Sequence, residues 1–457
     1  MRSALQFLLG RPSDWHLRRP TLPRIHFGLH LLGPLAVVAS CLASWPAFAG
    51  ATGDGNVALG LWVGAVSILL MAWSFILALR PRILEPLFGG LDSMYRVHRW
   101  AGSLAVAFMF WHTSIEPEIE GGIRGAAESI ADSAEDLAGA GEMMLYILIG
   151  LSLARIFPYR FWRWTHKLLG VPFVFASWHF FTAEKTYANG SAWGWWFGFW
   201  MVAGIATYLW RVVGLDMFRR GNPHRVVAVE HTGSTTRIEL EPIGRPLGQE
   251  LGQFAFLKFD VPGMSEPHPF TIASAPERGN LEFFIRHLGD WSAKLPETEL
   301  MGAKVFVEGP YGEFEPFGHD DERPLWIAGG VGITPFLAAL DRPIAGHRPT
   351  LLYAVRSVED NPIVDRLREA EAAGRVDLQL FTTATGRLSP SALDERFPDG
   401  MAGCHVALCG PAGLVASMAD AAHDRGAERT ETEDFDIRQG FGPERSREIA
   451  DALPLPV

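Results

Sequence analysis

This chain of 457 residues has few cysteines and no net positive charge. The three cysteines, Cys41, Cys404 and Cys409, are odd in number and too widely spaced to indicate a disulfide framework or a zinc site. Lys and Arg number 40 against 51 Asp and Glu, which gives a net charge of −11. We therefore expect no basic face that could bind nucleic acid.

Charge of either sign is infrequent, since 20% of residues are charged and 48% are hydrophobic. Residues 1–24 have an apolar run too short for a signal peptide and no small-residue cleavage site, so they are expected to form a retained cytoplasmic lead-in. Residues 25–218 contain apolar stretches of roughly 15 to 23 residues, a length typical of membrane-spanning helices. We predict six spans, at residues 26–48, 57–79, 98–115, 143–157, 166–182 and 193–213.

Basic residues are concentrated on one side of these predicted spans. Arg and Lys precede the first span, lie between spans two and three and between four and five, and follow the sixth. The opposite loops contain only Arg124 and Lys185, and the longer one is acidic. Because basic loops stay on the cytoplasmic side, we expect a multi-pass protein of the cell (inner) membrane, in contact with lipid, with both termini cytoplasmic.

The composition changes after Gly221 to that of a soluble protein. Short alternating runs such as HRVVAVEHTG and TTRIELEPIG predict an antiparallel β-barrel over residues 219–320. Over residues 321–457, apolar runs such as PLWIAGG and CHVALCG alternate with helical stretches, which predicts a parallel sheet covered by helices. The fold class is therefore multi-domain: a helical membrane bundle, a barrel and an α/β domain.

Two predicted spans carry a pair of histidines each. His112 follows His98 by fourteen residues, and His179 follows His166 by thirteen. At about 1.5 Å per residue each pair is separated by roughly 20 Å, so one histidine would lie near each face of the membrane. Both spans run in the same direction, so His98 would face His166 on the inside and His112 would face His179 on the outside. Each pair could ligate one haem iron axially.

Other interpretations of these histidines are open. Membrane histidines can hydrogen-bond between helices without binding a metal. His26 and His30, four residues apart on the first predicted span, are competing ligands. A step of thirteen residues also places His179 on a different face of an ideal helix from His166. A kink at Pro172 could help to bring the two histidines back onto one face.

Two motifs follow in the soluble half: HPFTIASAP, residues 268–276, and FFIRHLGDWSAKL, residues 283–295. With the histidine pairs, they resemble the ferric reductase and NADPH oxidase superfamily of transmembrane flavocytochromes, in particular its bacterial NADPH-oxidase-like members. The resemblance implies FAD, two b-type haems and NADPH as cofactors, and catalytic roles at the flavin ring for Phe270 and Thr271. It implies that FAD is bound by His268, Pro269, Phe270, Thr271, Ser274, Arg286, Gly289 and Ser292.

The segment AGGVGITPF, residues 328–336, follows a strand-like run and resembles the superfamily's NAD(P)H pyrophosphate loop. A glycine-rich turn alone is weak evidence, because many α/β proteins need glycine there simply to turn. The resemblance implies a catalytic position beside the nicotinamide for Cys409. The implied nucleotide-binding residues of these two segments are Gly329, Gly330, Gly332, Thr334, Pro335, Gly410 and Pro411.

Two further features bear on the nucleotides. Arg356 and Ser357 end a strand where they could bind a 2′-phosphate, which favours NADPH over NADH, although NADH is possible and a solvated strand end is the alternative. EDFDIR, residues 433–438, resembles a segment whose aromatic covers the flavin. Phe435 would take that role, but Ile437 replaces the second aromatic, and Phe441 is a rival.

The resemblance implies that electrons pass from cytoplasmic NADPH through FAD and two haems to an acceptor on the far side of the membrane. O2, giving superoxide, is the expected acceptor. Oxygen-reducing eukaryotic members carry a further histidine where this chain has Glu116, so ferric-chelate reduction is an alternative, as is electron transfer to an extracytoplasmic protein. A proton transporter or sensor is a third class, and it predicts neither haem nor flavin.

Overall fold

The chain forms two compact units whose boundary lies between residues 219 and 220. The structure, a computed structural model, describes residues 26–49, 55–115, 119, 121–153, 159–214, 221–318, 322–342, 347–359, 361–384, 386–427 and 429–433. The predicted lead-in, Glu116, Phe435 and Phe441 lie outside these residues.

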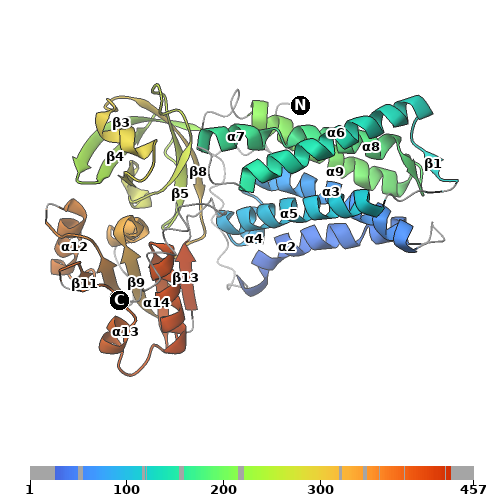
Figure 1. Cartoon of the computed structure of the whole chain (residues 1–457). Coiled ribbons are helices and arrows are strands. Elements are labelled where there is room, and N and C mark those ends of the chain that lie inside the picture. The colour runs from blue at the N-terminus through green and yellow to red at the C-terminus, as the bar shows by residue number, and fades with distance from the viewer. Residues whose placement is uncertain are drawn as a thin grey trace, which may run out of the picture. The chain divides into compact units, whose positions relative to one another are not determined.

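The first unit is helical (Figure 1). The long helix α3 is at its centre, because it contacts α2, α5, α8 and α9. Two-residue strands, β1 (Ile123–Arg124) and β2 (Glu184–Lys185), pair antiparallel. The helices are α2 (His26–Leu42), η1 (Trp45–Ala47), α3 (Gly55–Ala78), α4 (Glu85–Phe88), α5 (Leu91–Ile115), α6 (Glu128–Leu153), α7 (Tyr159–Lys167), α8 (Gly170–Thr182), α9 (Ala192–Leu209) and the π-helical turn η2 (Trp210–Gly214).

Several predicted helix boundaries are wrong. The helix that contains the third predicted span begins at Leu91 rather than residue 98, and the helix of the fourth begins at Glu128 rather than residue 143. Both helices start with polar turns that hydropathy does not mark. Asp92 pairs with Arg96 one turn later, 3.3 Å away, and an acidic residue such as Glu128 is favourable at a helix N-terminus.

The fifth predicted span is two helices rather than one. Helix α7 ends at Lys167 and α8 begins at Gly170. Pro172 has no N–H with which to bond the carbonyl of Leu168, and that carbonyl accepts instead from Val171 N over 3.0 Å. The predicted kink at Pro172 is therefore a break that lies just before it.

The predicted count of six spans is not confirmed. Two of the described helical segments, His30–Ala47 and Gly55–Ala78, are long and apolar enough to cross a membrane by themselves. Helix α8 has only 13 residues. The outer faces of the helices nevertheless expose large apolar side chains, which suits lipid better than water. They include Leu31, Leu35, Trp100, Phe110, Trp195 and Phe199.

The second unit begins with a six-stranded sheet of order β6-β5-β8-β3-β4-β7. All its pairings are antiparallel, as predicted, and the edge strands β6 and β7 contact each other. Its interior is apolar and includes Phe259, Phe283 and Val305. The strands are β3 (Asn222–Thr232), β4 (Thr235–Pro242), β5 (Phe254–Phe259), β6 (His268–Thr271), β7 (Leu281–Arg286) and β8 (Lys304–Tyr311), with short helices η3 (Pro276–Arg278) and η4 (Ser292–Glu297).

A five-stranded parallel sheet follows, as predicted, in the order β11-β10-β9-β12-β13. The strand order reverses between β9 and β12, which is where sheets of this kind bind ligands, beyond the carboxyl ends of the strands. Its elements are β9 (Arg323–Gly329), η5 (Gly330–Ile333), α11 (Thr334–Leu340), β10 (Thr350–Ala354), α12 (Pro362–Ala372), β11 (Asp377–Phe381), α13 (Ser391–Arg396), β12 (Cys404–Cys409), α14 (Ala412–Asp424) and β13 (Arg429–Glu433).

Candidate functional site

The first histidine pair lies between α5 and α7. The ring centroids of His98 and His166 are 6.0 Å apart, with 64° between the ring planes. Two imidazoles that ligate one metal from opposite sides, each with a metal–nitrogen distance near 2 Å, have ring centres roughly 6 Å apart. The spacing of this pair is therefore compatible with axial ligation of one iron.

The hydrogen bonds of this pair leave the same nitrogen available on both rings. The Nδ1–H of His98 donates to the carbonyl oxygen of Ser74 over 2.9 Å. His166 Nδ1 lies 3.1 Å from Ser152 Oγ, whose own hydrogen goes to the carbonyl of Leu148, so His166 is the donor. Bonds of this kind fix the tautomer and orientation of metal-binding imidazoles. Nε2 of each ring remains for a metal.

The second pair comes from α5 and α8. The Nδ1–H of His112 donates to the carbonyl of Gly60 over 2.8 Å. Gly64 is required beside it, because a Cβ there would lie 2.6 Å from His112 Nδ1. His179 lies within electrostatic reach of His112, and its Nδ1 is buried with no hydrogen-bond partner in the described part of the chain. The two predicted ligands are thus near enough to interact electrostatically.

Ser152→Ala is expected to weaken haem binding about 10- to 100-fold, because it removes the acceptor that orients His166. Haem titration of the haem-free protein measures the change. Ser133→Ala is the matched control: Ser133 lies on the same helix and bonds its own helix backbone, Ser129 O at 2.8 Å, but contacts no histidine. Equal affinities for the two variants would contradict the orienting role of Ser152.

The motif at residues 268–271 forms strand β6, and an aromatic cluster covers it. The Trp291 ring stacks on Phe270, with centroids 5.8 Å apart and 27° between planes, and lies 4.5 Å from the His268 ring. The sequence analysis gave Trp291 no role, although it belongs to the segment that resembles a flavin-binding element. Trp291 is the fifth residue after the end of β7, and its large apolar ring packs against the strand that carries Phe270.

The loop after β6 is held by hydrogen bonds within the unit. Ser274 Oγ accepts from the backbone N–H of Glu282 over 3.1 Å, and Gln249 Nε2 donates to the carbonyl of Ser274 over 3.0 Å. Ser274 and Thr271 are buried. Ser274 therefore fixes the loop, and Gln249 and Glu282 are contributors that the sequence patterns did not single out.

The turn at Gly289 is organised by Ser292. Its Oγ accepts from the backbone N–H groups of Leu288 and Gly289, over 3.0 and 3.2 Å. Ser292 begins η4 and so stabilises the turn in which a flavin pyrophosphate was predicted to bind. Arg286, at the end of β7, points toward the glycine-rich loop: its Nη1 is 3.8 Å from where a Cβ on Gly330 would lie.

The two glycine-containing segments of the parallel sheet meet at the reversal point between β9 and β12. A Cβ on Gly332 would lie 2.3 Å from the carbonyl oxygen of Cys409, and one on Gly329 would lie 2.7 Å from Pro411 Cδ. Gly330 has a φ of +56°, a backbone conformation that favours glycine. The close approach of the two segments therefore explains these glycines without any ligand. The absence of side chains also leaves the backbone of the loop accessible to a phosphate.

Neighbouring side chains fix this loop. Tyr353 OH donates to the carbonyl of Gly330 over 3.1 Å, Thr334 Oγ1 donates to that of Val331 over 3.0 Å, and Pro335 lies in the first turn of α11. The Cys409 side chain is 1% exposed and belongs to the hydrophobic core. Burial, with Glu433 nearby, raises the pKa of its thiol well above the ordinary value. The Cys409 side chain therefore packs in the core, and its catalytic position beside the nicotinamide stays a prediction.

Arg356 and Ser357 follow β10 at the same edge of the sheet. Both are exposed, and Ser357 Oγ accepts from Glu359 N over 3.1 Å. Parallel strands place their carboxyl ends on one edge, so these residues share it with the loops that follow β9 and β12. The arrangement suits an extended dinucleotide.

Two family models match the chain, one in each unit. Residues 63–177 match a ferric reductase like transmembrane component, and residues 225–315 match an FAD-binding domain. Dual oxidase 2 of Sus scrofa is 35% identical over 124 residues, which are 23% of this chain and 8% of that protein. NADPH oxidase 1 of Mus musculus is 29% identical over 145 residues, 31% of this chain and 24% of that protein. The matches thus span a small part of these relatives.

Solved structures resemble about half of the chain. The Amycolatopsis cytochrome P450 reductase GcoB is 26% identical, with a TM-score of 0.40 over 47% of this chain and 69% of that one. The flavohem-like FAD/NAD-binding domain of a Vibrio cholerae nitric oxide dioxygenase is 19% identical, with a TM-score of 0.41 over 49% and 100%.

The two matches make the first unit similar to a membrane component and part of the second unit similar to a flavin-binding domain. Parts of the chain are thus similar to a dual oxidase, an NADPH oxidase and a ferric reductase like transmembrane component.

Proposed function

We propose that the chain oxidises NADPH on the cytoplasmic side of the cell (inner) membrane and delivers the electrons to O2 on the far side. One NADPH would reduce two O2 to two superoxide ions, leaving NADP+ and a proton. The observation that carries the proposal is the His98–His166 pair, with rings 6.0 Å apart and each Nδ1–H directed to a protein oxygen. Hydrogen bonding between helices alone would not require both Nε2 atoms to stay available.

The residues present suit the three groups that this function needs. His98 with His166, and His112 with His179, would hold two b-type haems; residues 219–320 would hold FAD and residues 321–457 NADPH. FAD accepts two electrons as hydride and releases them singly, and haem carries one electron at a time. The chain itself orients the imidazoles through Ser74, Ser152 and Gly60 and supports the flavin motif through Trp291.

Preference for NADPH is proposed from Arg356 and Ser357. Arg356 is exposed beyond β10, where its guanidinium forms no ion pair with the described residues and could meet a 2′-phosphate. Arg356→Ala is expected to raise the KM for NADPH about tenfold or more and to leave that for NADH nearly unchanged, because an Arg–phosphate contact is charge-assisted. Steady-state kinetics with both nucleotides measures the ratio. Equal effects on both would contradict this assignment.

Ferric-chelate reduction is the second candidate, favoured by the matched ferric reductase like transmembrane component. The two are separated by comparing ferric-chelate-dependent NADPH oxidation without oxygen and superoxide-dismutase-sensitive dye reduction in air. For the oxygen-reducing function, the dismutase should suppress most of the dye reduction, and ferric chelate should support slower turnover.

A third possibility is an electron-transfer subunit that serves an extracytoplasmic protein. It predicts haem reduction by NADPH with slow turnover on both small acceptors. Absorption spectra of the purified protein, recorded after NADPH addition, test all three together: absence of reduced bis-imidazole haem bands after haem and FAD supplementation would overturn the proposed function.

A further inference from the structure

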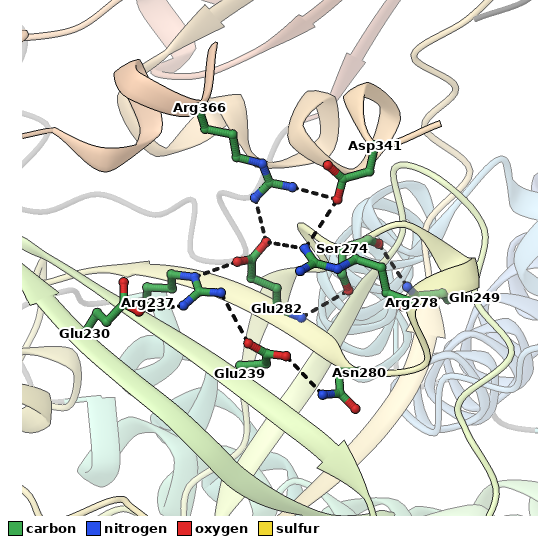
Figure 2. Close-up of polar contacts among 10 residues, drawn as sticks. All are labelled: Glu230, Arg237, Glu239, Gln249, Ser274, Arg278, Asn280, Glu282, Asp341 and Arg366. Atoms are coloured by element: carbon green, nitrogen blue, oxygen red, sulfur yellow. Dashed lines mark hydrogen bonds and ion pairs between the residues drawn. The ribbon is translucent and has the colours of Figure 1, made fainter. Parts of the chain in front are cut away.

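A buried carboxylate on β7 is surrounded by three arginines (Figure 2). The Glu282 side chain is 4% exposed. Arg237 Nε donates to it over 2.6 Å and Arg366 Nη1 over 2.7 Å, and Arg278 Nη1 lies 3.7 Å away. Burial alone would raise the pKa of Glu282, but Arg366 and Arg237 outweigh it and hold that pKa below its usual value.

These arginines come from two different parts of the unit. Arg237 is on β4 of the antiparallel sheet, whereas Arg366 is on α12, which belongs to the parallel-sheet part. Arg366 Nη2 also donates to Asp341, the residue that ends α11, over 2.8 Å (Figure 2). A single carboxylate therefore ties the antiparallel sheet to two helices of the parallel-sheet part.

The backbone of Glu282 holds the flavin motif. Its N–H donates to Ser274 Oγ over 3.1 Å, and its carbonyl accepts from Ala273 N over 2.8 Å. Residues 273 and 274 belong to the segment HPFTIASAP. Any shift of the Glu282 main chain is thus passed to the loop that follows Phe270 and Thr271.

The helices at the other end of this network carry the nucleotide segments. Helix α11 begins directly after the glycine-rich loop, at Thr334, and α12 begins shortly after Arg356 and Ser357. A buried ion pair with several hydrogen bonds favours one geometry, because leaving either charge buried and unpaired is strongly destabilising. The network therefore fixes the flavin motif relative to both segments.

We propose that Glu282 is a positioning residue for hydride transfer: through Arg366 and Asp341 it sets the flavin loop against the nicotinamide-binding segments. This role rests on the proposed function. With both nucleotides bound, the step that Glu282 would assist is transfer of a hydride from NADPH to FAD, which would leave NADP+ and reduced flavin. Small errors of alignment slow such a step strongly.

Anaerobic stopped-flow measurement of flavin reduction by NADPH in the full-length protein tests the role. Glu282→Gln is expected to lower the limiting rate about 10- to 100-fold. FAD content and the NADPH concentration that gives half the limiting rate should remain within about twofold, because the substitution leaves the Glu282 backbone bonds in place and the carboxylate itself contacts only arginines outside the nucleotide-binding segments. Arg366→Lys retains the charge but cannot bond Glu282 and Asp341 through two separate guanidinium nitrogens. It should therefore lower the rate in the same way.

Glu230→Gln is the matched control. Glu230 also pairs with Arg237, at 2.8 Å, but its side chain is 57% exposed and has no contact with α12. The limiting rate of this variant should equal that of the wild type. Asp341→Asn offers a milder change on the nucleotide side if Glu282→Gln fails to fold.

Hydrogen exchange of the FAD-free protein supplies a readout that does not depend on catalysis. Glu282→Gln should speed amide exchange in residues 272–275 and in α12, and Glu230→Gln should not. If wild-type flavin is not reduced by NADPH, the proposed function fails, while the exchange data still decide whether Glu282 holds these segments together. Wild-type rates and wild-type exchange in Glu282→Gln and Arg366→Lys would overturn the inference.

Discussion

His98→Ala is expected to stop electron delivery to the far-side acceptor while NADPH still reduces the flavin. His166 would be left without the ring 6.0 Å away that completes the pair. One of the two haems should then be lost, because a b-type haem is held chiefly by its axial ligands. Haem content per protein should fall by about half, and acceptor reduction should fall on the order of 100-fold or more.

His30→Ala is the control for this experiment. His30 lies on α2, its side chain is exposed, and it is one of the two competing ligands, with His26, that the sequence offers. Haem content should be unchanged in this variant, and His112→Ala should lose the other haem. A His98→Ala protein that keeps both haems, or a His30→Ala protein that loses one, would show that the ligands are assigned wrongly.

Gly332→Ala is expected to have the largest effect in the parallel-sheet part. A Cβ at this position would lie 2.3 Å from the carbonyl oxygen of Cys409, and backbone is the neighbour least able to move away. We expect a loss of about 1–3 kcal/mol in the free energy of unfolding of this part of the chain. NADPH-dependent flavin reduction should fall at least tenfold, because the loop can no longer lie against the Cys409–Pro411 segment.

Two comparisons make this prediction specific. Gly413→Ala, on α14, places its Cβ where no atom lies within 4 Å, so stability should be unchanged or raised by up to about 1 kcal/mol. Dithionite supplies electrons without NADPH, and it should reduce the haems of Gly332→Ala as fast as those of the wild type. Normal NADPH-dependent reduction in Gly332→Ala would show that close contact of the two segments is unnecessary.

The sheets could be predicted because their patterns are local. Alternation in HRVVAVEHTG and apolar runs such as PLWIAGG mark strands directly, and antiparallel and parallel sheets are found in these places. The starts of α5 and α6 could not be predicted from hydropathy, since their first turns are polar. The break before α8 could not be predicted either, because it depends on which N–H bonds the carbonyl of Leu168 when Pro172 has no N–H to donate.

Site residues could be predicted where they belong to a short sequence motif. They could not be predicted where residues distant in the sequence come together only in the folded chain. The glycine-rich loop and the segment at Cys409 could be recognised from short motifs, and they meet in the structure. Glu282, Arg366 and Asp341 lie in three elements and carry no local pattern, so only the three-dimensional structure brings them together. Burial likewise shows that the Cys409 thiol belongs to the core.

The break between Lys167 and Gly170 lets the rings of His166 and His179 point in directions that are independent of each other. In one continuous helix, a thirteen-residue step would lock the two rings about 140° apart around a shared axis. With His166 on α7 and His179 on α8, rotation of one short helix re-aims one ring and leaves the other where it is. Under the proposed function, separate mutations on α7 and α8 would therefore alter the inner and the outer haem site independently.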